Sequence, residues 1–553
     1  MTKRAVIHVE NTENLVEFAE FLATEGWTIL SANKTEEILK KQKIPVTKEN
    51  ALSENNMFLA DTSKLIRRVM LTKYHEEDEQ YISHPDAEEN NIYIICMNVL
   101  PSINTAIVSK QFDNQLCPKN FFVTTVLRNA FRNYENLLIL TDPADYKEAM
   151  IQIRTGSITL DFRTYLAAKA LNLVSAFDAG LSASILQSPK FNEHFMNYMT
   201  LPFKRELQLH SGMNSQQAAY LYKSPAEEGS VGNFLKYQGK DLSYTLVNDI
   251  SYAWRQINSL FALLKDQPTV KSTNSDGYEF TTQFTPLTGT VFSLAVKFGT
   301  ILGASHATNV LDSFKATFTY DAVTTVDTVF ACSAVINQEA AEEIVKGNFA
   351  AIVAPSFTTE AKQILTQNKK TKLVPSFKVT NIDLDGHFIN GGLLLQTKDT
   401  TLFNQWKVRT KNRPSQIQTD EMVFGMLLAM GARSYSAVLL KENAICGIAQ
   451  GCTSAKRAID GVWFEALKHT ERASGVTSDK FGFSSQELDT SNLGEVLVCD
   501  DAIPFCDSTI KLIESGVKAI LQTGGTSSDE EFINYCNEHD VVMVFTGMTH
   551  LSF

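Results

Sequence analysis

Cysteine is scarce in this sequence, and its spacing excludes the common cysteine-based sites. The eight cysteines among 553 residues form no C-x-x-C pair, so a disulfide framework is not expected. The two closest pairs, Cys446/Cys452 and Cys499/Cys506, have no histidine nearby and spacings that fit no common zinc motif. We therefore predict free thiols in a core and no metal site.

Long apolar runs and excess positive charge are also missing. The longest apolar runs, Ile92–Met97 and Val541–Phe545, are far shorter than the roughly 20 residues that cross a bilayer. The formal net charge of -12 repels phosphate backbones and anionic membranes, so we expect binding to neither nucleic acid nor membrane. Met1–Arg4 leads directly into a strand-like stretch without the apolar core of a signal peptide, from which we expect a cytoplasmic location.

What the sequence does contain is an alternation of short apolar runs and amphipathic stretches, which predicts an α/β fold. Near the N-terminus, strand Ala5–Val9, a helix with Leu15 and Phe18 buried, and strand Trp27–Leu30 form a β-α-β unit. Further elements predicted in the first half are a helix from Thr35, strands Asn91–Val99 and Leu137–Leu140, and a long helix Leu160–Leu186.

The same alternation returns near the C-terminus. The elements predicted there are strands Ala437–Leu440, Ala444–Ile448, Glu495–Val498, Val517–Leu521 and Val541–Phe545, with helices Ser454–Leu467, Asp507–Glu514 and Asp529–His539. We place the main domain boundary near residue 200. The remaining 350 or so residues exceed one compact core, so two subdomains are expected, dividing near 367–390.

Two loops join a strand to a helix and carry residues suited to anions. Leu521–Asp529 contains Gly524 and Gly525 among hydroxyl side chains, so that backbone amides and a helix N-terminus converge there. An anion site and an ordinary capped turn are equally compatible with this loop. Gln450–Ser454 precedes Lys456 and Arg457, which either contact an anion or are solvated helix charges.

Several segments, taken in order, resemble the AICAR transformylase/IMP cyclohydrolase family, a bifunctional enzyme family of purine biosynthesis. The C-terminal matches are Gly447–Ser454, Asp500–Phe505, Leu521–Asp529 and Met543–His550. The resemblance extends over essentially the whole chain through Asn14–Phe18, Thr141–Tyr146, Gly239–Tyr244 and Ala354–Phe357, and Gly212–Gln217 is similar to the family's G-x-N-P-[HQ]-Q.

This resemblance implies a fold, a reaction and an assembly. It implies a methylglyoxal-synthase-like cyclohydrolase domain over residues 1–200 and a transformylase domain with a duplicated cytidine-deaminase-like fold over residues 201–553. It also implies a homodimer and formyl transfer from 10-formyltetrahydrofolate to AICAR, whose product is then cyclised to IMP. Formyl transfer needs proton transfer and stabilisation of a tetrahedral oxyanion.

The transformylase half departs from the family at the residues that the resemblance assigns to this chemistry. The family's lysine-histidine pair reads Lys297-Phe298, its asparagine is Tyr435, and the arginine after its G-Q-x-[SN] loop is Ala455. Lys456 or Arg457 would have to substitute for that arginine. The arginine-tyrosine pair that holds AICAR becomes His210-Ser211, and the C-terminal R-H-F-R-H becomes Thr549–Phe553.

The cyclohydrolase half departs in the same direction. The phosphate loop S-x-S-x-K-T reads His8–Glu13, and the G-G-T turn reads Asn33–Thr35, so carboxylates stand where phosphate is expected. Two unit charges about 4 Å apart interact by about 4 kcal/mol at an effective dielectric of about 20, so this reversal of sign is decisive. Other changed segments are Ala60–Arg67, Asn98–Ser102 and Arg128–Asn133.

Two hypotheses follow. In the first, the chain is a cytoplasmic, homodimeric pseudoenzyme or repurposed family member that binds a protein partner or an AICAR-like or IMP-like small molecule. In the second, it keeps the formyl transfer, with or without the IMP cyclohydrolase activity, and uses substitute residues with 10-formyltetrahydrofolate as its cosubstrate. The candidate catalytic residues are Lys297, Tyr435 and His550. The candidate substrate-binding residues are His210, Asn214, Gln217, Lys456, Arg457, Gly524 and Gly525.

Overall fold

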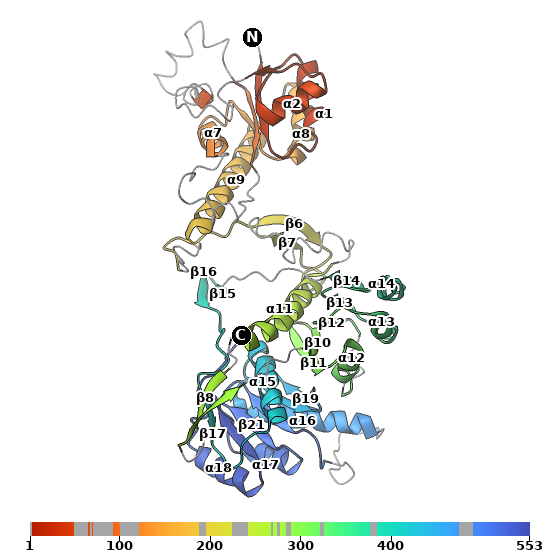
Figure 1. Ribbon diagram of the computed structural model, residues 1–553. Helices are drawn as coiled ribbons and strands as arrows, with labels where there is room; N and C mark the ends of the chain where they lie inside the picture. The colour runs from red at the N-terminus through yellow and green to blue at the C-terminus, as the bar shows by residue number, and fades with distance from the viewer. Residues whose placement is uncertain are drawn as a thin grey trace. The chain divides into compact units, whose positions relative to one another are not determined.

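The computed structural model describes residues 3–48, 65–66, 69, 92–99, 121–186, 195–223, 242–266, 269–273, 277–283, 289–320, 326–375, 384–474 and 490–553. Its chain forms two compact units (Figure 1). The first comprises Met1–Arg205 with Tyr222–Glu228, and the second comprises Glu206–Leu221 with Gly229–Phe553. Each unit is built around its own sheet.

The first unit contains a five-stranded parallel sheet in the order β3-β2-β1-β4-β5. Its strands are β1 (Arg4–Val9), β2 (Thr28–Ser31), β3 (Thr47–Lys48), β4 (Ile94–Asn98) and β5 (Leu138–Leu140). Strands β2 and β3 lie on one side of β1, whereas β4 and β5 lie on its other side, so the strand order reverses between β1 and β4. In open parallel sheets, ligands bind at the carboxyl ends of the strands beside such a point.

Helices cover both faces of this sheet because alternate strand residues are apolar on each face. Its helices are α1 (Leu15–Thr24), α2 (Asn33–Lys41), α7 (Phe121–Phe131), α8 (Tyr146–Thr155), α9 (Leu160–Leu186) and the 3-10 turn η2 (Pro143–Asp145). One face packs against α7 and α9, and the other against α1, α2 and α8. The predicted β-α-β unit and the bounds of the long helix are confirmed.

The second unit contains a mixed thirteen-stranded sheet in the order β14-β13-β12-β10-β11-β19-β18-β20-β21-β22-β17-β8-β9. Its strands are β8 (Thr269–Thr273), β9 (Glu279–Gln283), β10 (Val291–Lys297), β11 (Thr300–Ala307), β12 (Val329–Cys332), β13 (Ala351–Ala354), β14 (Lys372–Pro375), β17 (Trp406–Val408), β18 (Ala437–Lys441), β19 (Ala444–Ala449), β20 (Val496–Cys499), β21 (Ala519–Gln522) and β22 (Val542–Phe545).

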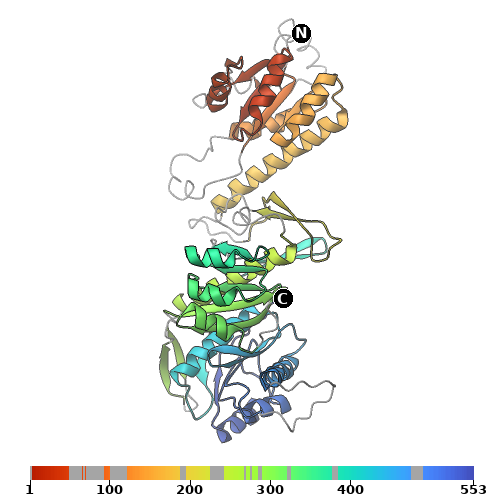
Figure 2. The ribbon, with the colours of Figure 1, turned by 90° about the vertical axis from the view of Figure 1, so that its right-hand side faces the viewer.

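Helices cover both faces of this sheet. Helices α11 (Tyr244–Asp266) and α15 (Gln416–Gly431) pack on the first face. The opposite face carries α12 (Val310–Thr317), α13 (Gln338–Ile344) and α14 (Thr359–Leu365) at one end, the green helices of Figure 2. It carries α16 (Ala455–Ser474), α17 (Asp507–Glu514) and α18 (Asp529–Glu538) at the other end.

Two hairpins complete the described chain. They are β6 (Lys204–Leu209) with β7 (Ala219–Lys223), and β15 (Leu384–Ile389) with β16 (Gly392–Thr397). The predicted subdomain division near 367–390 covers β14, β15 and the residues between them, of which 376–383 lie outside the described ranges, and it stays a prediction. The mixed α/β class with parallel strands in both units agrees with the predicted fold class.

Candidate functional site

Strand directions bring most of the predicted site residues to one edge of the thirteen-stranded sheet. Strand β10 ends at Lys297, and its antiparallel neighbour β11 begins there. Neighbouring strands β11, β19, β18 and β20 alternate in direction, whereas β20, β21 and β22 are parallel. The start of β18 and the ends of β19, β20, β21 and β22 therefore lie at the edge where β10 ends, which we call the Lys297 edge.

A buried carboxylate holds the turn that presents Lys297. Asp249 on α11 is 4% exposed, and its two oxygens accept the backbone N–H groups of Phe298 at 2.8 Å and Gly299 at 2.7 Å. Both of these residues have positive φ, 52° and 69°, a conformation that costs a phenylalanine energy. Burial raises the pKa of Asp249, and its two backbone hydrogen bonds oppose that rise.

The turn carries an ammonium and an aromatic ring at its surface. The Lys297 Nζ donates to the backbone oxygen of Val326 at 2.8 Å and lies 5.7 Å from the centre of the Phe298 ring. Phe298 is 68% exposed and stands where the resemblance places a histidine. Its ring neither accepts nor donates a proton, so this position has no general acid or base.

Backbone hydrogen bonds join Tyr435 to the predicted Gln450–Ser454 loop. Tyr435 N donates to Cys452 O at 2.8 Å, and Cys452 N donates to Tyr435 O at 3.1 Å. The Gln450 side chain accepts from Ile301 N at 3.1 Å and donates to Ile301 O at 2.7 Å. Tyr435, this loop and the start of β11 after Lys297 are thereby held together at the Lys297 edge.

A second buried carboxylate, Asp500, organises the middle of this edge. Its side chain is fully buried and accepts from the Ser434 hydroxyl at 2.6 Å and from Ser436 N at 3.0 Å. Its backbone oxygen accepts His550 N at 3.0 Å. Burial raises the pKa of the Asp500 carboxyl, and the serine hydrogen bonds oppose that rise.

The predicted catalytic role of His550 does not fit its surroundings. Its side chain is 0% exposed, with Nδ1 2.6 Å from Asp399 Oδ2 and Nε2 3.0 Å from Leu402 O. Both ring nitrogens are therefore occupied by contacts within the protein. An imidazole that is buried and bound at both nitrogens holds the chain in place, so these contacts do not favour the catalytic role, which stays a prediction.

The cations of α16 are paired locally. Lys456 donates to Asp460 at 2.9 Å, one helical turn away, and Arg457 donates to the Thr453 hydroxyl at 3.1 Å. Both interactions lie at the exposed surface. This arrangement favours solvated helix charges over an anion site for these two residues.

In the loop at Gly524 and Gly525, hydrogen-bond donors that could bind an anion are already bound by a carboxylate of the same loop. Gly525 N donates to Asp529 Oδ2 at 2.7 Å, and the Thr526 hydroxyl donates to the other oxygen of the same carboxylate. A side chain on Gly524 would meet the ring of Phe545, which explains the glycine by packing. Of the two interpretations that the sequence left open, the structure favours the capped turn.

The loop that carries His210, Asn214 and Gln217 is attached to the start of α11. His210 N donates to Leu242 O at 2.8 Å, and Tyr244 N donates to Ser211 O at 3.0 Å. Asn214 donates to Gln217 Oε1 from its backbone at 3.0 Å, so these two side chains stabilise their own turn. The His210 side chain is exposed.

In the first unit, an asparagine occupies the loop that the resemblance assigns to phosphate. The carboxyl ends of β1 and β4 form what we call the Asn98 edge. Asn98 is 4% exposed, and its Oδ1 accepts the N–H groups of Glu10 at 2.8 Å and Asn11 at 2.9 Å. The Thr35 hydroxyl accepts Val9 N at 3.1 Å. Three consecutive amides of this loop are thus bonded within the protein.

Other predicted features contribute no chemistry within the described ranges. Segments Ala60–Ser63, Leu100–Ser102 and Gly239–Asp241 lie outside those ranges, together with Lys64 and Arg67. The seven described cysteines are free thiols, five of them buried, and burial raises the pKa of Cys96 to about 12. No cluster of three or more metal-binding side chains and no helix apolar and long enough to cross a membrane occurs among the described residues.

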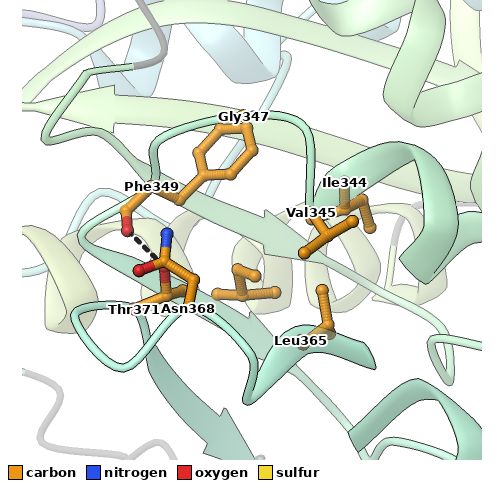
Figure 3. Close-up of a pocket in the computed structure, with 8 residues that line it drawn as sticks. Ile344, Val345, Gly347, Phe349, Leu365, Asn368 and Thr371 are labelled. Atoms are coloured by element: carbon orange, nitrogen blue, oxygen red, sulfur yellow. Dashed lines mark hydrogen bonds between the residues drawn. The ribbon is translucent and has the colours of Figure 1, made fainter. Parts of the chain in front are cut away.

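Two hollows lie away from these residues. The first lies among α13, β13 and α14, where the Thr371 hydroxyl donates to Phe349 O at 2.8 Å, and it has no room for a water molecule (Figure 3). Its remaining lining is mostly aliphatic. The second, about 500 Å³, lies between α7 and α9 in the first unit, and its Arg128 is paired with Asp178. Neither hollow contains a candidate catalytic or substrate-binding residue, although Arg128 begins the changed segment Arg128–Asn133.

Sequence reasoning missed Asp249, Asp500 and Asn98 as organisers of these edges. Asp249 and Asn98 contact loops 49 to 88 positions away in the chain, and the Ser434 hydroxyl is 66 positions from Asp500. The available signal was an acidic or amide residue within or just after an apolar run. That pattern does not identify its partner.

Comparison with known proteins relates the sequence to a family. The family model described as AICARFT/IMPCHase bienzyme matches residues 130–460. The bifunctional purine biosynthesis protein PurH of Clostridium acetobutylicum is 26% identical over 560 residues, covering 100% of this chain and 99% of that protein. PurH of Brachyspira hyodysenteriae is 25% identical over 559 residues with the same coverage. A solved structure titled "Crystal structure of ForH" is 21% identical and covers 33% of this chain and 99% of that chain, but its TM-score of 0.28 supports no argument.

Proposed function

The chain belongs to the AICARFT/IMPCHase bienzyme family, and from this premise we propose that it is a divergent member in which neither inherited reaction proceeds at an enzymatic rate. In this proposal residues 1–200 form a cyclohydrolase-like domain and residues 201–553 a transformylase-like domain. The fold of each domain is kept to bind a protein partner or a small molecule. The chain is then a pseudoenzyme or a repurposed homologue.

The observation that carries this proposal is the turn at Lys297. The turn is fixed by two hydrogen bonds to Asp249, yet the side chain after the lysine is a phenyl ring. General acid-base catalysis contributes on the order of 10² to 10⁴ in rate. The loss of a proton carrier from an otherwise ordered turn is therefore enough to suppress formyl transfer.

Three further contacts support the same conclusion. His550 is bound at both ring nitrogens, so it does not replace the missing imidazole. Asp529 occupies the Gly525 amide, and Asn98 occupies the amides of Glu10 and Asn11. Anion-binding loops bind phosphate through such amides, and these amides already have acceptors.

A direct assay tests the proposal. Purified protein is incubated with AICAR and 10-formyltetrahydrofolate, and separately with formyl-AICAR, with PurH of Clostridium acetobutylicum as the positive control. We expect no product above the rate without protein. Turnover on the order of one per second that is lost in Lys297→Ala would overturn the proposal.

Binding is tested separately from catalysis. A ligand that binds the native state raises the melting temperature, so AICAR and IMP are added at millimolar concentration to the full chain. We expect no shift with either nucleotide. A saturable rise in melting temperature without turnover would retain the pseudoenzyme assignment and identify a nucleotide as its ligand.

The alternative function is AICAR formyl transfer by substitute residues. It is favoured by one observation, which is that Tyr435 and the Gln450–Ser454 loop are hydrogen-bonded beside the strand that follows Lys297. In this alternative Lys297 and Tyr435 act in proton transfer, Lys456 and Arg457 bind the substrate, and 10-formyltetrahydrofolate supplies the formyl group. Tyr435→Phe should then abolish turnover, whereas the pseudoenzyme has none to lose.

The proposal includes an assembly and a location. We expect a homodimer, as the family resemblance implies, and light scattering should give twice the chain mass of 61.6 kDa. We expect a cytoplasmic protein with no nucleic-acid or membrane partner, which fits the net charge of -12. A monomer in light scattering would contradict the dimer and leave the catalytic proposal to the assays above.

A further inference from the structure

The hollow between α7 and α9 in the first unit (Figure 1) lies apart from the Asn98 edge. Arg128 is in the last turn of α7, and β5 begins shortly afterwards at the sheet edge opposite to Asn98. The hollow measures about 500 Å³, which is within the range of small-molecule pockets. Its lining residues are Arg128, Leu171, Val174, Ser175, Asp178, Ala179 and Thr200.

One face of α9 forms the apolar wall of this hollow. Leu171, Val174 and Ala179 line it together with Ser175 and Asp178, at positions three or four residues apart that share one side of a helix. Val174 is 2% exposed and belongs to the core that packs α9 against the sheet. The wall is therefore part of the packed domain and exists before a ligand arrives.

A pair of opposite charges completes the hollow. The Nη2 of Arg128 on α7 contacts the Oδ2 of Asp178 on α9. A guanidinium carries five N–H donors and a carboxylate accepts about four hydrogen bonds, so both groups retain capacity for a ligand. Their side chains are 45% and 34% exposed, and an ion pair with that much solvent contact contributes little. A ligand that binds both charges can therefore replace it.

We propose that this hollow binds a free α-amino acid with an apolar side chain. A ligand with one net charge meets an attractive and a repulsive group here, whereas a zwitterion meets two attractive ones. The ligand's carboxylate pairs with Arg128, whose fork of donors suits a carboxylate, and its ammonium pairs with Asp178. Its side chain lies against the apolar wall of α9, and the hydroxyls of Ser175 and Thr200 border the same space.

Three probes that share a phenyl ring test this assignment by isothermal titration calorimetry on the full-length protein. L-phenylalanine carries both charges, 3-phenylpropionate lacks the ammonium, and 2-phenylethylamine lacks the carboxylate. We expect one saturable site per chain for L-phenylalanine at millimolar concentration or below. Each analogue should bind at least about tenfold more weakly, because it loses one charge-assisted interaction.

Two variants separate the charges and distinguish recognition from a general loss of structure. Arg128→Gln should weaken L-phenylalanine at least about tenfold and leave 2-phenylethylamine binding at least as tightly as before. Asp178→Asn should weaken L-phenylalanine to the same extent and leave 3-phenylpropionate unweakened. A misfolded protein does not give this crossed pattern.

A third variant and a control locate the site. Ser175→Trp places an indole in the hollow from an exposed position of α9, so it should abolish binding of all three probes. Asp161→Asn removes an exposed carboxylate from the first turn of the same helix and should bind L-phenylalanine as the unmodified protein does.

Three results would overturn the inference. The first is no saturable heat with L-phenylalanine at millimolar concentration, and the second is equal affinity for the three probes, which would leave the ring alone as the recognised group. The third is binding that survives Ser175→Trp, which would place the site elsewhere. None of these measurements uses AICAR, IMP or turnover, so the outcomes are independent of the proposed function.

Discussion

The Asn98 edge of the first unit and the Lys297 edge of the second each use a buried polar side chain to fix a loop, but one side chain is neutral and the other is an acid. At each edge a buried side chain binds backbone amides of a loop that follows or precedes a strand. The first unit uses a neutral amide, Asn98, on Glu10 and Asn11. The second uses a fully buried carboxylate, Asp500, on Ser436 N and the Ser434 hydroxyl.

The difference lies in what each group loses on burial. A neutral amide loses only its hydrogen bonds with water, and the loop amides replace them. A carboxylate also loses the solvation of its charge, which is why burial raises the pKa of Asp500. The first edge should therefore be insensitive to pH at this residue, whereas the second should respond to it.

The largest expected effect is at Asp500. Asp500→Ala removes the acceptor of a buried backbone N–H and of a serine hydroxyl, and an unsatisfied buried donor costs about 1–3 kcal/mol. We expect the free energy of unfolding of the second unit to fall by about 3 kcal/mol. Urea unfolding, followed by hydrogen exchange of peptides from each unit, measures it. A loss confined to the first unit would contradict the assignment.

A smaller loss is expected at Asn98. Asn98→Ala leaves the amides of Glu10 and Asn11 without their acceptor, and we expect a loss of about 2 kcal/mol in the first unit. The same urea series measures this loss, with the exposed Asn172→Ala on α9 as its control. Equal stabilities of the two variants would show that solvent satisfies the loop amides as well as Asn98 does.

Asp500→Asn tests whether the stability of the second unit depends on pH through Asp500. A raised pKa means that the folded state binds more protons than the unfolded state above about pH 4, so stability falls as pH rises through that window. Asparagine does not titrate. We expect the unfolding free energy of the unmodified second unit to decrease relative to Asp500→Asn between about pH 4.5 and 7.5, and parallel profiles in urea melts would reject this.

The smallest effect is expected at Asp529, whose contacts are local. Asp529 accepts from an amide only four positions away at the exposed start of α18, and loss of one such hydrogen bond costs about 1 kcal/mol. Asp529→Ala should lower the stability of the second unit by about that amount in the same urea series. Asp529→Ser retains an acceptor and should recover part of it.

The bounds of several helices and strands were predictable because they depend on the spacing of apolar residues within one segment. The helix Leu160–Leu186 and the helix Asp507–Glu514 have the predicted bounds, since their apolar spacing and end residues are read within one segment. The strand that ends at Phe545 was found in the same way. The free cysteines followed from their sparse spacing.

The candidate site was only partly predictable because its contacts connect distant segments. The sequence placed Lys297, Tyr435 and His550 in one functional group, and strand directions bring all three to the Lys297 edge. It did not show that His550 is bound at both nitrogens, since Asp399 lies 151 positions away. It also left two interpretations of the Gly524-Gly525 loop open, an anion site and a capped turn. The hydrogen bond from Gly525 N to Asp529, which favours the capped turn, is seen only in the structure.

By itself the sequence determined the α/β alternation, the family resemblance and the replacement of a histidine by Phe298, because each depends on residue type and order. Only the tertiary structure decided which polar groups are already satisfied. A hydrogen bond depends on the distance and direction between two groups, and these are set when separate strands align at one sheet edge. For that reason the contacts of His550, the Asn98 loop and the Asp249 turn are known only from the folded structure.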